Sequence, residues 1–272
     1  MSVILKKPLV SVTWLYQNLE AENLIVLDAT INKHYDAKQA QIPKARFFDI
    51  KNKFSDVSGA FPSTFPSQEQ FQEEARNLGI NNNSAIVVYD DKGIYSSARV
   101  WWLFKAFGFQ NIAVLDGGFP AWLSSGFPTA FMTKYEGDKG DFEANLQPRF
   151  MTFFEDVKNA SKNKTHTIVD ARSSERFLCK VPEPRAGLRR GTIPNSINLP
   201  FTNLLINGVF KSEAEVKEIF SKTIASTLDP VIFSCGSGIT ACVLALGATM
   251  SGYKNIAVYD GSWTEWGSLV KA

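Results

Sequence analysis

One stretch near the C-terminal end combines a nucleophile with a turn suited to binding an anion. Cys235 opens the run Cys-Gly-Ser-Gly-Ile-Thr, in which two glycines allow backbone N–H groups to close around one point. A helix that begins just after such a turn favours negative charge at its N-terminus. These surroundings stabilise the thiolate form of a cysteine, which is its nucleophilic form. We therefore predict that Cys235 performs covalent chemistry; the alternative is a structural cysteine buried in a glycine-rich turn.

The residues on either side of the turn predict the elements that hold it. Val231, Ile232 and Phe233 form a short run of β-branched and aromatic residues, which is typical of a buried strand. Residues 239–250 are rich in alanine and leucine, and Gly252 follows as a C-cap. Cys235 is thus expected on a strand-to-helix turn at the carboxyl end of a strand, where α/β proteins bind ligands.

The chain contains two copies of one pattern. Residues 111–118 (Asn-Ile-Ala-Val-Leu-Asp-Gly-Gly) are answered by residues 255–262 (Asn-Ile-Ala-Val-Tyr-Asp-Gly-Ser) at an offset of 144, which Trp122 and Trp266 also keep. A period this long indicates duplicated domains. In both copies short apolar runs alternate with helical patterns, which predicts an α/β fold: in each domain, a mainly parallel sheet flanked by helices.

The repeat also predicts the domain organisation and an asymmetry between the copies. We expect an N-terminal domain of residues 1–130, a polar linker of residues 131–148 and a C-terminal domain of residues 149–272. Predicted strands cover residues 25–27, 85–89, 112–115, 167–169, 231–233 and 256–259, and helices cover residues 68–78 and 98–107. At the offset of 144 the counterpart of Cys235 is Asp91, a poor nucleophile, so only the second copy is expected to be catalytic.

A basic segment in the second copy could bind an anionic substrate. Six cationic residues lie close together in the sequence, and Glu175 and Glu183 are the only acidic residues among them. The six are Arg172, Arg176, Lys180, Arg185, Arg189 and Arg190. The planar guanidinium of arginine suits a carboxylate, because its fork binds both oxygens. The alternative is a solvated basic loop.

Composition limits the remaining function classes. The net charge of +2 over 272 residues gives no reason to expect a nucleic-acid or membrane partner. Three cysteines without a CxxC pair, no signal peptide and no apolar run of about 20 residues favour a cytoplasmic protein. The sequence shows no metal-ligand cluster and no phosphate-binding glycine fingerprint, so no metal and no cofactor are expected.

Together these features resemble the tandem rhodanese sulfurtransferases over essentially the whole chain. The duplicated α/β domain, the six-residue loop in the second copy only, Asp-Gly-Ser-Trp at residues 260–263 and Gly-Thr-Ile-Pro at residues 191–194 all fit that family. The loop Cys-Gly-Ser-Gly-Ile-Thr is typical of its 3-mercaptopyruvate members, whereas thiosulfate members usually have Arg-Lys after the cysteine.

The resemblance implies a mechanism and a set of site residues. Cys235 would take sulfane sulfur from 3-mercaptopyruvate as a persulfide, and would pass it to cyanide, a small thiol or a thioredoxin-like protein. The loop residues Gly236, Ser237, Gly238, Ile239 and Thr240 would bind the anionic donor and the persulfide. Arg176 and Arg185 match the Arg-Phe…Pro-Glu-Pro-Arg pattern with which mercaptopyruvate members bind the donor carboxylate.

Several alternatives stay open or are disfavoured. Thiosulfate is the alternative donor, and a non-catalytic binding module is a more distant possibility. A cysteine phosphatase needs an arginine six positions after the cysteine, where this chain has Ala241. Many animal members have an aspartate and a histidine near the stretch after Phe-Phe-Asp-Ile of the first copy, but here residues 47–50 are followed by Lys51, and the only histidines, His34 and His166, lie elsewhere. A Ser–His–Asp relay is therefore not expected, and Cys179 and Cys242 are interpreted as an ordinary thiol and a core residue.

Overall fold

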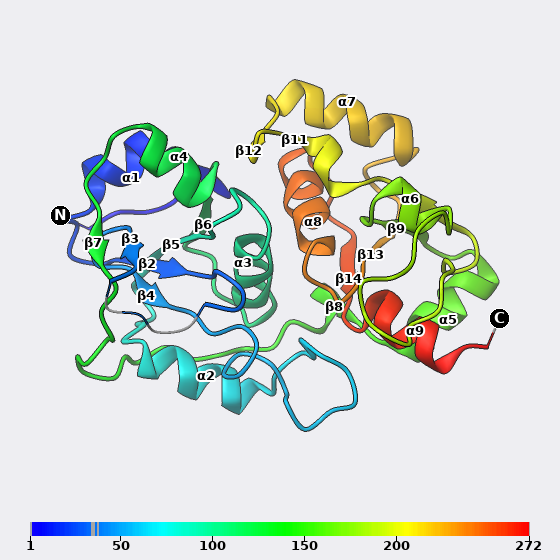
Figure 1. Ribbon diagram of the computed structural model, residues 1–272, viewed down its shortest axis with the longest axis horizontal. Coiled ribbons are helices and arrows are strands. Elements are labelled where there is room, and N and C mark those ends of the chain that lie inside the picture. The colour runs from blue at the N-terminus through cyan, green and yellow to red at the C-terminus, as the bar shows by residue number, and fades with distance from the viewer. Residues whose placement is uncertain (1, 34–35, 37, 272) are drawn as a thin grey trace. The chain divides into compact units, whose positions relative to one another are not determined.

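The computed structural model describes residues 2–33, 36 and 38–271, and its internal contacts divide the chain into two units (Figure 1). The first unit comprises Met1–Val57, Phe65–Gln147 and Asn207–Phe210, and the second comprises Ser58–Thr64, Pro148–Ile206 and Lys211–Ala272. Each unit contains a five-stranded parallel sheet flanked by helices, which confirms the predicted α/β fold.

The N-terminal half of the chain forms a sheet of order β1-β6-β5-β2-β4. Its elements are β1 (Leu9–Val10), α1 (Val12–Asn18), β2 (Leu24–Asp28), β3 (Ala40–Gln41), β4 (Arg46–Phe47), α2 (Gln68–Asn77), β5 (Ala85–Tyr89), α3 (Ser97–Ala106), β6 (Ile112–Leu115), α4 (Gly118–Ser124) and β7 (Ala130–Phe131). Every residue of β5 is buried, as expected for a central strand covered on both faces. Leu15 and Trp122 pack α1 and α4 on the strands, while Phe71 and Phe104 place α2 and α3 in an aromatic cluster.

The C-terminal half repeats this plan with a sheet of order β10-β9-β13-β14-β8. Its elements are η1 (Pro148–Phe150), β8 (Met151–Thr152), α5 (Phe154–Asn163), β9 (Thr167–Asp170), α6 (Ser174–Phe177), β10 (Ser196–Asn198), η2 (Phe201–Leu204), β11 (Leu205–Ile206), β12 (Val209–Phe210), α7 (Glu213–Thr223), β13 (Val231–Ser234), α8 (Ala241–Met250), β14 (Ile256–Tyr259) and α9 (Ser262–Leu269). Val157 and Trp266 pack α5 and α9 on the sheet. Helix α8 is buried from Ala241 to Ala248, which explains why its sequence has no polar face.

Residues 131–148, predicted as a linker, pack against the first unit. Phe142 is buried and its ring meets those of Phe71, Phe104 and Phe109 at centroid distances of 5.7–6.0 Å. Its backbone N–H donates to the carbonyl of Ile80 at 3.1 Å. The segment is polar overall, but the buried ring of Phe142 holds it against α2 and α3. The domain boundaries at 130 and 149 stay a prediction.

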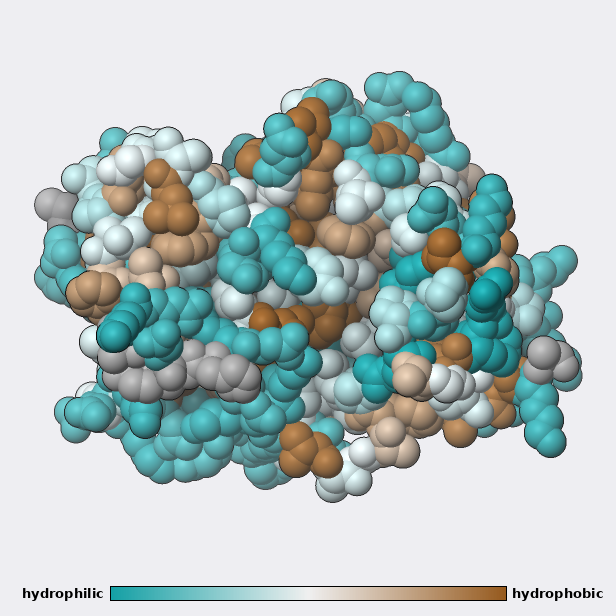
Figure 2. All heavy atoms as spheres, in the orientation of Figure 1, coloured by the Kyte–Doolittle hydropathy of each residue, from teal (hydrophilic) through white to brown (hydrophobic). Residues whose placement is uncertain are grey.

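The face of the molecule drawn in Figure 2 is mostly hydrophilic. In the view of Figure 2 hydrophilic residues cover most of the exposed area, and hydrophobic residues show singly or in small groups. Across residues 2–33, 36 and 38–271, no helix is both long and apolar enough to cross a membrane.

The strand registers correct the predicted counterpart of Cys235. Asp28 pairs with Tyr89 in the first sheet and Asp170 pairs with Ser234 in the second, so the residues that follow are Asp90 and Cys235. Their carbonyls accept equivalent hydrogen bonds at 3.0 Å, from the N–H groups of Phe119 and Trp263. The counterpart is thus Asp90 and not Asp91, because the first loop has one residue more before its helix.

Asp90 fills its own loop with negative charge. Its carboxylate is fully buried and accepts the N–H groups of Lys92, Tyr95 and Ser97, each at 2.9 Å. The Ser97 hydroxyl donates to the same carboxylate at 2.6 Å. Because the carboxylate occupies the focus of these donors, the first-copy loop is a closed anion site whose anion belongs to the chain.

We expect Asp90 and Asp91 to differ sharply in their effect on stability. Asp90→Asn removes the charge that accepts these hydrogen bonds, and should lower the free energy of unfolding by about 1.5–3 kcal/mol. The Asp91 side chain is largely exposed. Its pKa is raised, first by the partial loss of solvent around its carboxylate and then by the neighbouring Asp90 charge, so its ionised form gains nothing from folding. Asp91→Asn should therefore change stability by no more than about 0.5 kcal/mol, or stabilise slightly. Chemical denaturation of the two variants tests this, and equal losses would contradict the assignment.

Candidate active site

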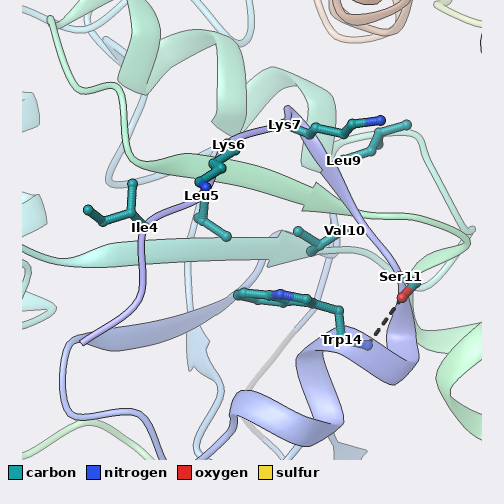
Figure 3. A pocket seen from close by; sticks show the side chains of 8 residues that line it. All are labelled: Ile4, Leu5, Lys6, Lys7, Leu9, Val10, Ser11 and Trp14. Carbon is teal, nitrogen blue, oxygen red and sulfur yellow. Dashed lines mark hydrogen bonds between the residues drawn. The ribbon is translucent and has the colours of Figure 1, made fainter. Parts of the chain in front are cut away.

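One surface hollow of the protein lies beside the N-terminal strand β1 and helix α1. The hollow in Figure 3, with a volume of about 420 Å³, is lined by Leu5, Lys6, Lys7, Val10 and Trp14 among others. The Ser11 hydroxyl in it accepts the N–H of Trp14 at 3.1 Å as the N-cap of α1. No residue in the lining is a cysteine, histidine or carboxylate, so this hollow offers neither a nucleophile nor a general base.

Cys235 follows β13 directly and is only 2 % exposed. The loop then turns through Gly238, whose φ of +72° lies in the left-handed region that glycine adopts without strain, and enters α8 at Ala241. The predicted strand, turn and helix are therefore all present. The thiol sits at the carboxyl end of a central strand, before the positive end of a buried helix.

The side chain of Ser262 holds the Cys235 loop in place through hydrogen bonds to its backbone. The Ser262 hydroxyl oxygen accepts the N–H of Cys235 at 3.0 Å and the N–H of Gly238 at 3.1 Å. It donates its own hydrogen to the carbonyl of Tyr259 at 2.8 Å, and it lies 4.0 Å from the sulfur of Cys235. Since its only hydrogen goes to Tyr259, Ser262 orients the cysteine backbone rather than the thiol.

Helix α9 also fixes the loop through its first residues. The N–H of Trp263 donates to the carbonyl of Cys235 at 3.0 Å, and the N–H and hydroxyl of Thr264 donate to the carbonyl of Gly236 at 2.9 and 2.6 Å. Ser262 has a φ of +49°, which is uncommon for a residue with a side chain and is tolerated here by its three hydrogen bonds. The sequence analysis does not predict this role of Ser262, although Ser262 lies in the Asp-Gly-Ser-Trp run that fits the family.

The other N–H groups of the loop are left for an anion. Within the described part of the chain, those of Gly236, Ser237, Ile239, Thr240 and Ala241 donate to no other group. In the first copy three N–H groups of the loop, those of Lys92, Tyr95 and Ser97, close around the Asp90 carboxylate. The second loop thus has the same kind of donors with no carboxylate to receive them.

The two hydroxyl groups of the loop remain candidates for donor binding. Thr240 is the N-cap of α8, yet its side chain makes no capping hydrogen bond, so its hydroxyl is not used to hold the start of the helix. Ser237 is half-buried. Roles in binding for Ser237, Thr240 and the glycines stay predictions.

Of the two predicted arginines, the structure brings Arg176 to the loop and leaves Arg185 at the surface. A Cβ atom added at Gly236 would lie 3.1 Å from Nη2 of Arg176, so the guanidinium rests directly against the residue after Cys235. Nη2 also donates to Glu183 at 2.5 Å, while the buried Nε has no partner. Arg185 is exposed, and its side chain makes no hydrogen bond to the residues the structure describes.

The remaining candidates carry no further chemistry in this geometry. Cys242 is buried in α8 and Cys179 is exposed, and neither is in a disulfide. His166 precedes β9, at the opposite end of the strands from Cys235, and His34 lies outside the described residues. Over the described ranges, no group of three or more His, Cys, Asp or Glu residues is placed to hold a metal ion.

The fold and the loop define a class: a duplicated α/β protein in which one copy presents a cysteine on an anion-binding turn. Comparison with known proteins agrees, since the model of the rhodanese-like domain matches residues 11–125 and 154–269. The chain belongs to the rhodanese family, and within it to the sulfurtransferases that act on 3-mercaptopyruvate or thiosulfate.

Three relatives show how far this similarity reaches. The mouse 3-mercaptopyruvate sulfurtransferase is 37% identical over 96% of this chain and 92% of its own. The Arabidopsis thaliana mitochondrial thiosulfate/3-mercaptopyruvate sulfurtransferase 1 is 38% identical over 97% of this chain and 77% of its own. The crystal structure of a 3-mercaptopyruvate sulfotransferase from Escherichia coli, which has the rhodanese fold, superposes with a TM-score of 0.84 at 32% identity, covering 95% of this chain and 99% of that one.

We expect loss of the Ser262 hydroxyl to impair both folding and sulfur transfer. Ser262→Ala leaves two buried N–H groups without an acceptor, which should cost about 1–3 kcal/mol of stability. The displaced cysteine should lower kcat/KM by about tenfold or more. Ser268→Ala is the matched control, because that hydroxyl lies on the exposed side of the same helix and donates only to the Thr264 carbonyl. Equal effects of the two substitutions would refute the pinning role.

Proposed function

We propose that the protein is a 3-mercaptopyruvate sulfurtransferase, which moves sulfur through a persulfide on Cys235 to thiol or cyanide acceptors and releases pyruvate. The observation that carries this proposal is the guanidinium of Arg176 against Gly236. It offers a carboxylate-binding group beside the nucleophile, in a loop that itself carries no charged residue between Gly236 and Thr240. That combination suits a donor with one carboxylate and a neutral thiol end.

The first half-reaction is a displacement at sulfur. The thiolate of Cys235 attacks the sulfur of mercaptopyruvate, an S–S bond forms, and the C–S bond breaks with its electron pair going to the three-carbon fragment. That fragment leaves as the enolate of pyruvate, which takes up one proton to become pyruvate. The enzyme keeps the sulfur as a Cys235 persulfide.

The second half-reaction returns the enzyme to its first state. An acceptor thiolate or cyanide attacks the outer sulfur, and the S–S bond breaks with its electron pair returning to Cys235. Both the thiolate and the persulfide are anions, so the unpaired N–H groups of the loop stabilise them by preorganised hydrogen bonds. The Asp90 carboxylate supports this interpretation, because it is a covalently attached anion held by the equivalent loop.

Gly236 separates this proposal from the thiosulfate alternative. Even a Cβ atom there would meet Nη2 of Arg176 at 3.1 Å, tighter than ordinary contact. An arginine at position 236, as thiosulfate members usually have, would crowd and repel Arg176. The glycine therefore allows the guanidinium to lie beside Cys235, which favours mercaptopyruvate over thiosulfate.

The acceptor and the compartment follow from the same chemistry. We propose a small thiol or a thioredoxin-like protein as the acceptor, and a cytoplasmic location in which the free cysteines stay reduced. No cofactor is needed for either half-reaction, since the nucleophile and the leaving groups exchange sulfur directly.

The persulfide can be located by mass spectrometry. Incubation with mercaptopyruvate should add one sulfur atom to the protein, on Cys235, and cyanide should remove it. Cys242→Ser serves as the control, because that buried thiol should take no label. A label that stays on Cys179 or Cys242 in a Cys235→Ser variant would contradict the assignment.

Donor choice can be tested at Arg176. A charge-assisted hydrogen bond contributes about 1.5–3 kcal/mol, so Arg176→Gln should lower kcat/KM for mercaptopyruvate by about 10- to 200-fold. Thiosulfate turnover should start lower and change less. Lys180→Gln is the matched control, since Lys180 is an exposed cation on the same segment.

Two further results bear on the same prediction. Arg185→Gln reports whether the exposed arginine joins the clamp when the donor is bound. Introducing Arg-Lys at positions 236 and 237 should shift preference toward thiosulfate. A wild-type preference for thiosulfate, or equal losses with both donors in Arg176→Gln, would overturn the mercaptopyruvate assignment.

A further inference from the structure

A buried chain of charges leads from the end of β9 to the catalytic loop. Arg172 has a fully buried side chain, and it binds the carboxylate of Asp170 through Nε at 2.9 Å and Nη2 at 2.7 Å. Its Nη1 donates to Oε1 of Glu183 at 2.8 Å. Burial alone would lower the pKa of Arg172, but the hydrogen bonds and charges of Asp170 and Glu183 outweigh it and raise that pKa. Arg172 is therefore a permanently charged anchor.

Glu183 connects this anchor to the substrate side. Its side chain is 1% exposed, and its second oxygen, Oε2, accepts a hydrogen bond from Nη2 of Arg176 at 2.5 Å. Pro182 and Pro184 flank Glu183 and restrict the backbone conformation at this position, which helps to fix where its carboxylate lies. One carboxylate thus holds two arginines, one through each oxygen.

Among the described residues, the Arg176 guanidinium has a single hydrogen-bond acceptor to hold it in place. It lies on the four-residue helix α6, its side chain is 24% exposed, and among the described residues Glu183 is its only hydrogen-bond acceptor. Nη2 lies against Gly236, and neither Nε nor Nη1 donates to a protein group. A long side chain on so short an element would adopt several rotamers without Glu183, at a cost in binding each time a donor had to select one.

We propose that Glu183 is the positioning residue of the donor site, and that it acts by fixing Arg176 beside Cys235 through the charge of Arg172. Glu183 does not touch the donor, since both its oxygens are already occupied by arginines. This inference rests on the proposed function, because it assigns Arg176 to the donor carboxylate. This role explains why an acidic residue lies inside a segment that binds an anion. The Glu183 carboxylate is shared by two arginines, so it can order Arg176 while Arg172 balances its charge.

Glu183→Gln is the variant that tests the bridge. A glutamine can accept from one arginine through its oxygen, but its amide nitrogen would face the other guanidinium as donor against donor. Glu175→Gln is the matched control, because Glu175 is exposed on the same segment and makes no side-chain hydrogen bond to the residues described. The experiment measures KM and kcat for mercaptopyruvate, and the rate of Cys235 persulfidation by inorganic polysulfide, which carries no carboxylate.

We expect Glu183→Gln to raise KM for mercaptopyruvate by about tenfold, with kcat and polysulfide persulfidation changed by less than about threefold. Glu175→Gln should change none of these values. In an Arg176→Gln background, Glu183→Gln should have no further effect on KM, since the residue through which it acts is gone. If Glu183→Gln does not fold, Glu183→Asp, which keeps the charge next to Arg172, replaces it in the same cycle.

Two results would overturn the positioning role: a KM for Glu183→Gln equal to that of Glu175→Gln, or the same rise in KM with and without Arg176. Failure of the proposed function looks different, because the wild type would then persulfidate Cys235 from thiosulfate and not from mercaptopyruvate. In that case the cycle is scored with thiosulfate. A KM effect that vanishes in the Arg176→Gln background still supports the role of Glu183, and an effect that persists refutes it.

Discussion

A turn that joins a strand to a helix leaves backbone N–H groups without partners, and the Cys235 loop is arranged around that requirement. Two of these groups, from Cys235 and Gly238, receive one shared acceptor in Ser262. The rest stay open toward the position where an anion can sit. Everything that makes Cys235 useful depends on this division, because a loop with all its donors satisfied internally could not stabilise a thiolate or a persulfide.

The first copy shows the same turn in its closed form. There Asp90 supplies the anion from the chain, with hydrogen bonds at 2.6–2.9 Å, and the loop is finished without a ligand. At the position of Ser262 the first copy has Gly118, which shares its left-handed backbone with a φ of +54°. One duplicated architecture thus yields a loop closed by its own carboxylate and a loop with open N–H donors, and the two differ in a carboxylate, a thiol and a hydroxyl.

The sequence was a good guide wherever local pattern decides the outcome. The buried strands β5 and β13 appear in the sequence as apolar runs, and helix α8 appears as an apolar segment. Each of these elements is packed against protein on all sides, so none of them has a polar face. Cys235 could be singled out because glycines, a strand and a helix start surround it in the sequence itself. Its partner Ser262 could not, since it lies 27 residues away and acts through φ and position rather than through an unusual residue type.

Two other features needed the three-dimensional register. The offset of 144 predicts Asp91, because it is measured on repeated residues that follow the loop. The first loop contains one extra residue, so the residue that follows the strand is offset by 145 instead. The charge of Glu183 was visible among the arginines, but only the fold shows that it divides its oxygens between Arg172 and Arg176. Charge patterns predict that a segment attracts anions, and they do not predict which cation is held in place.

The most direct test of the central claim is a crystal structure of the protein after reaction with mercaptopyruvate. The account predicts a persulfide on Cys235 whose outer sulfur lies within hydrogen-bonding distance of the N–H groups at Ile239 and Ala241, as the Asp90 carboxylate lies beside those of Tyr95 and Ser97. An outer sulfur that points away from the loop and meets none of its N–H groups would contradict it.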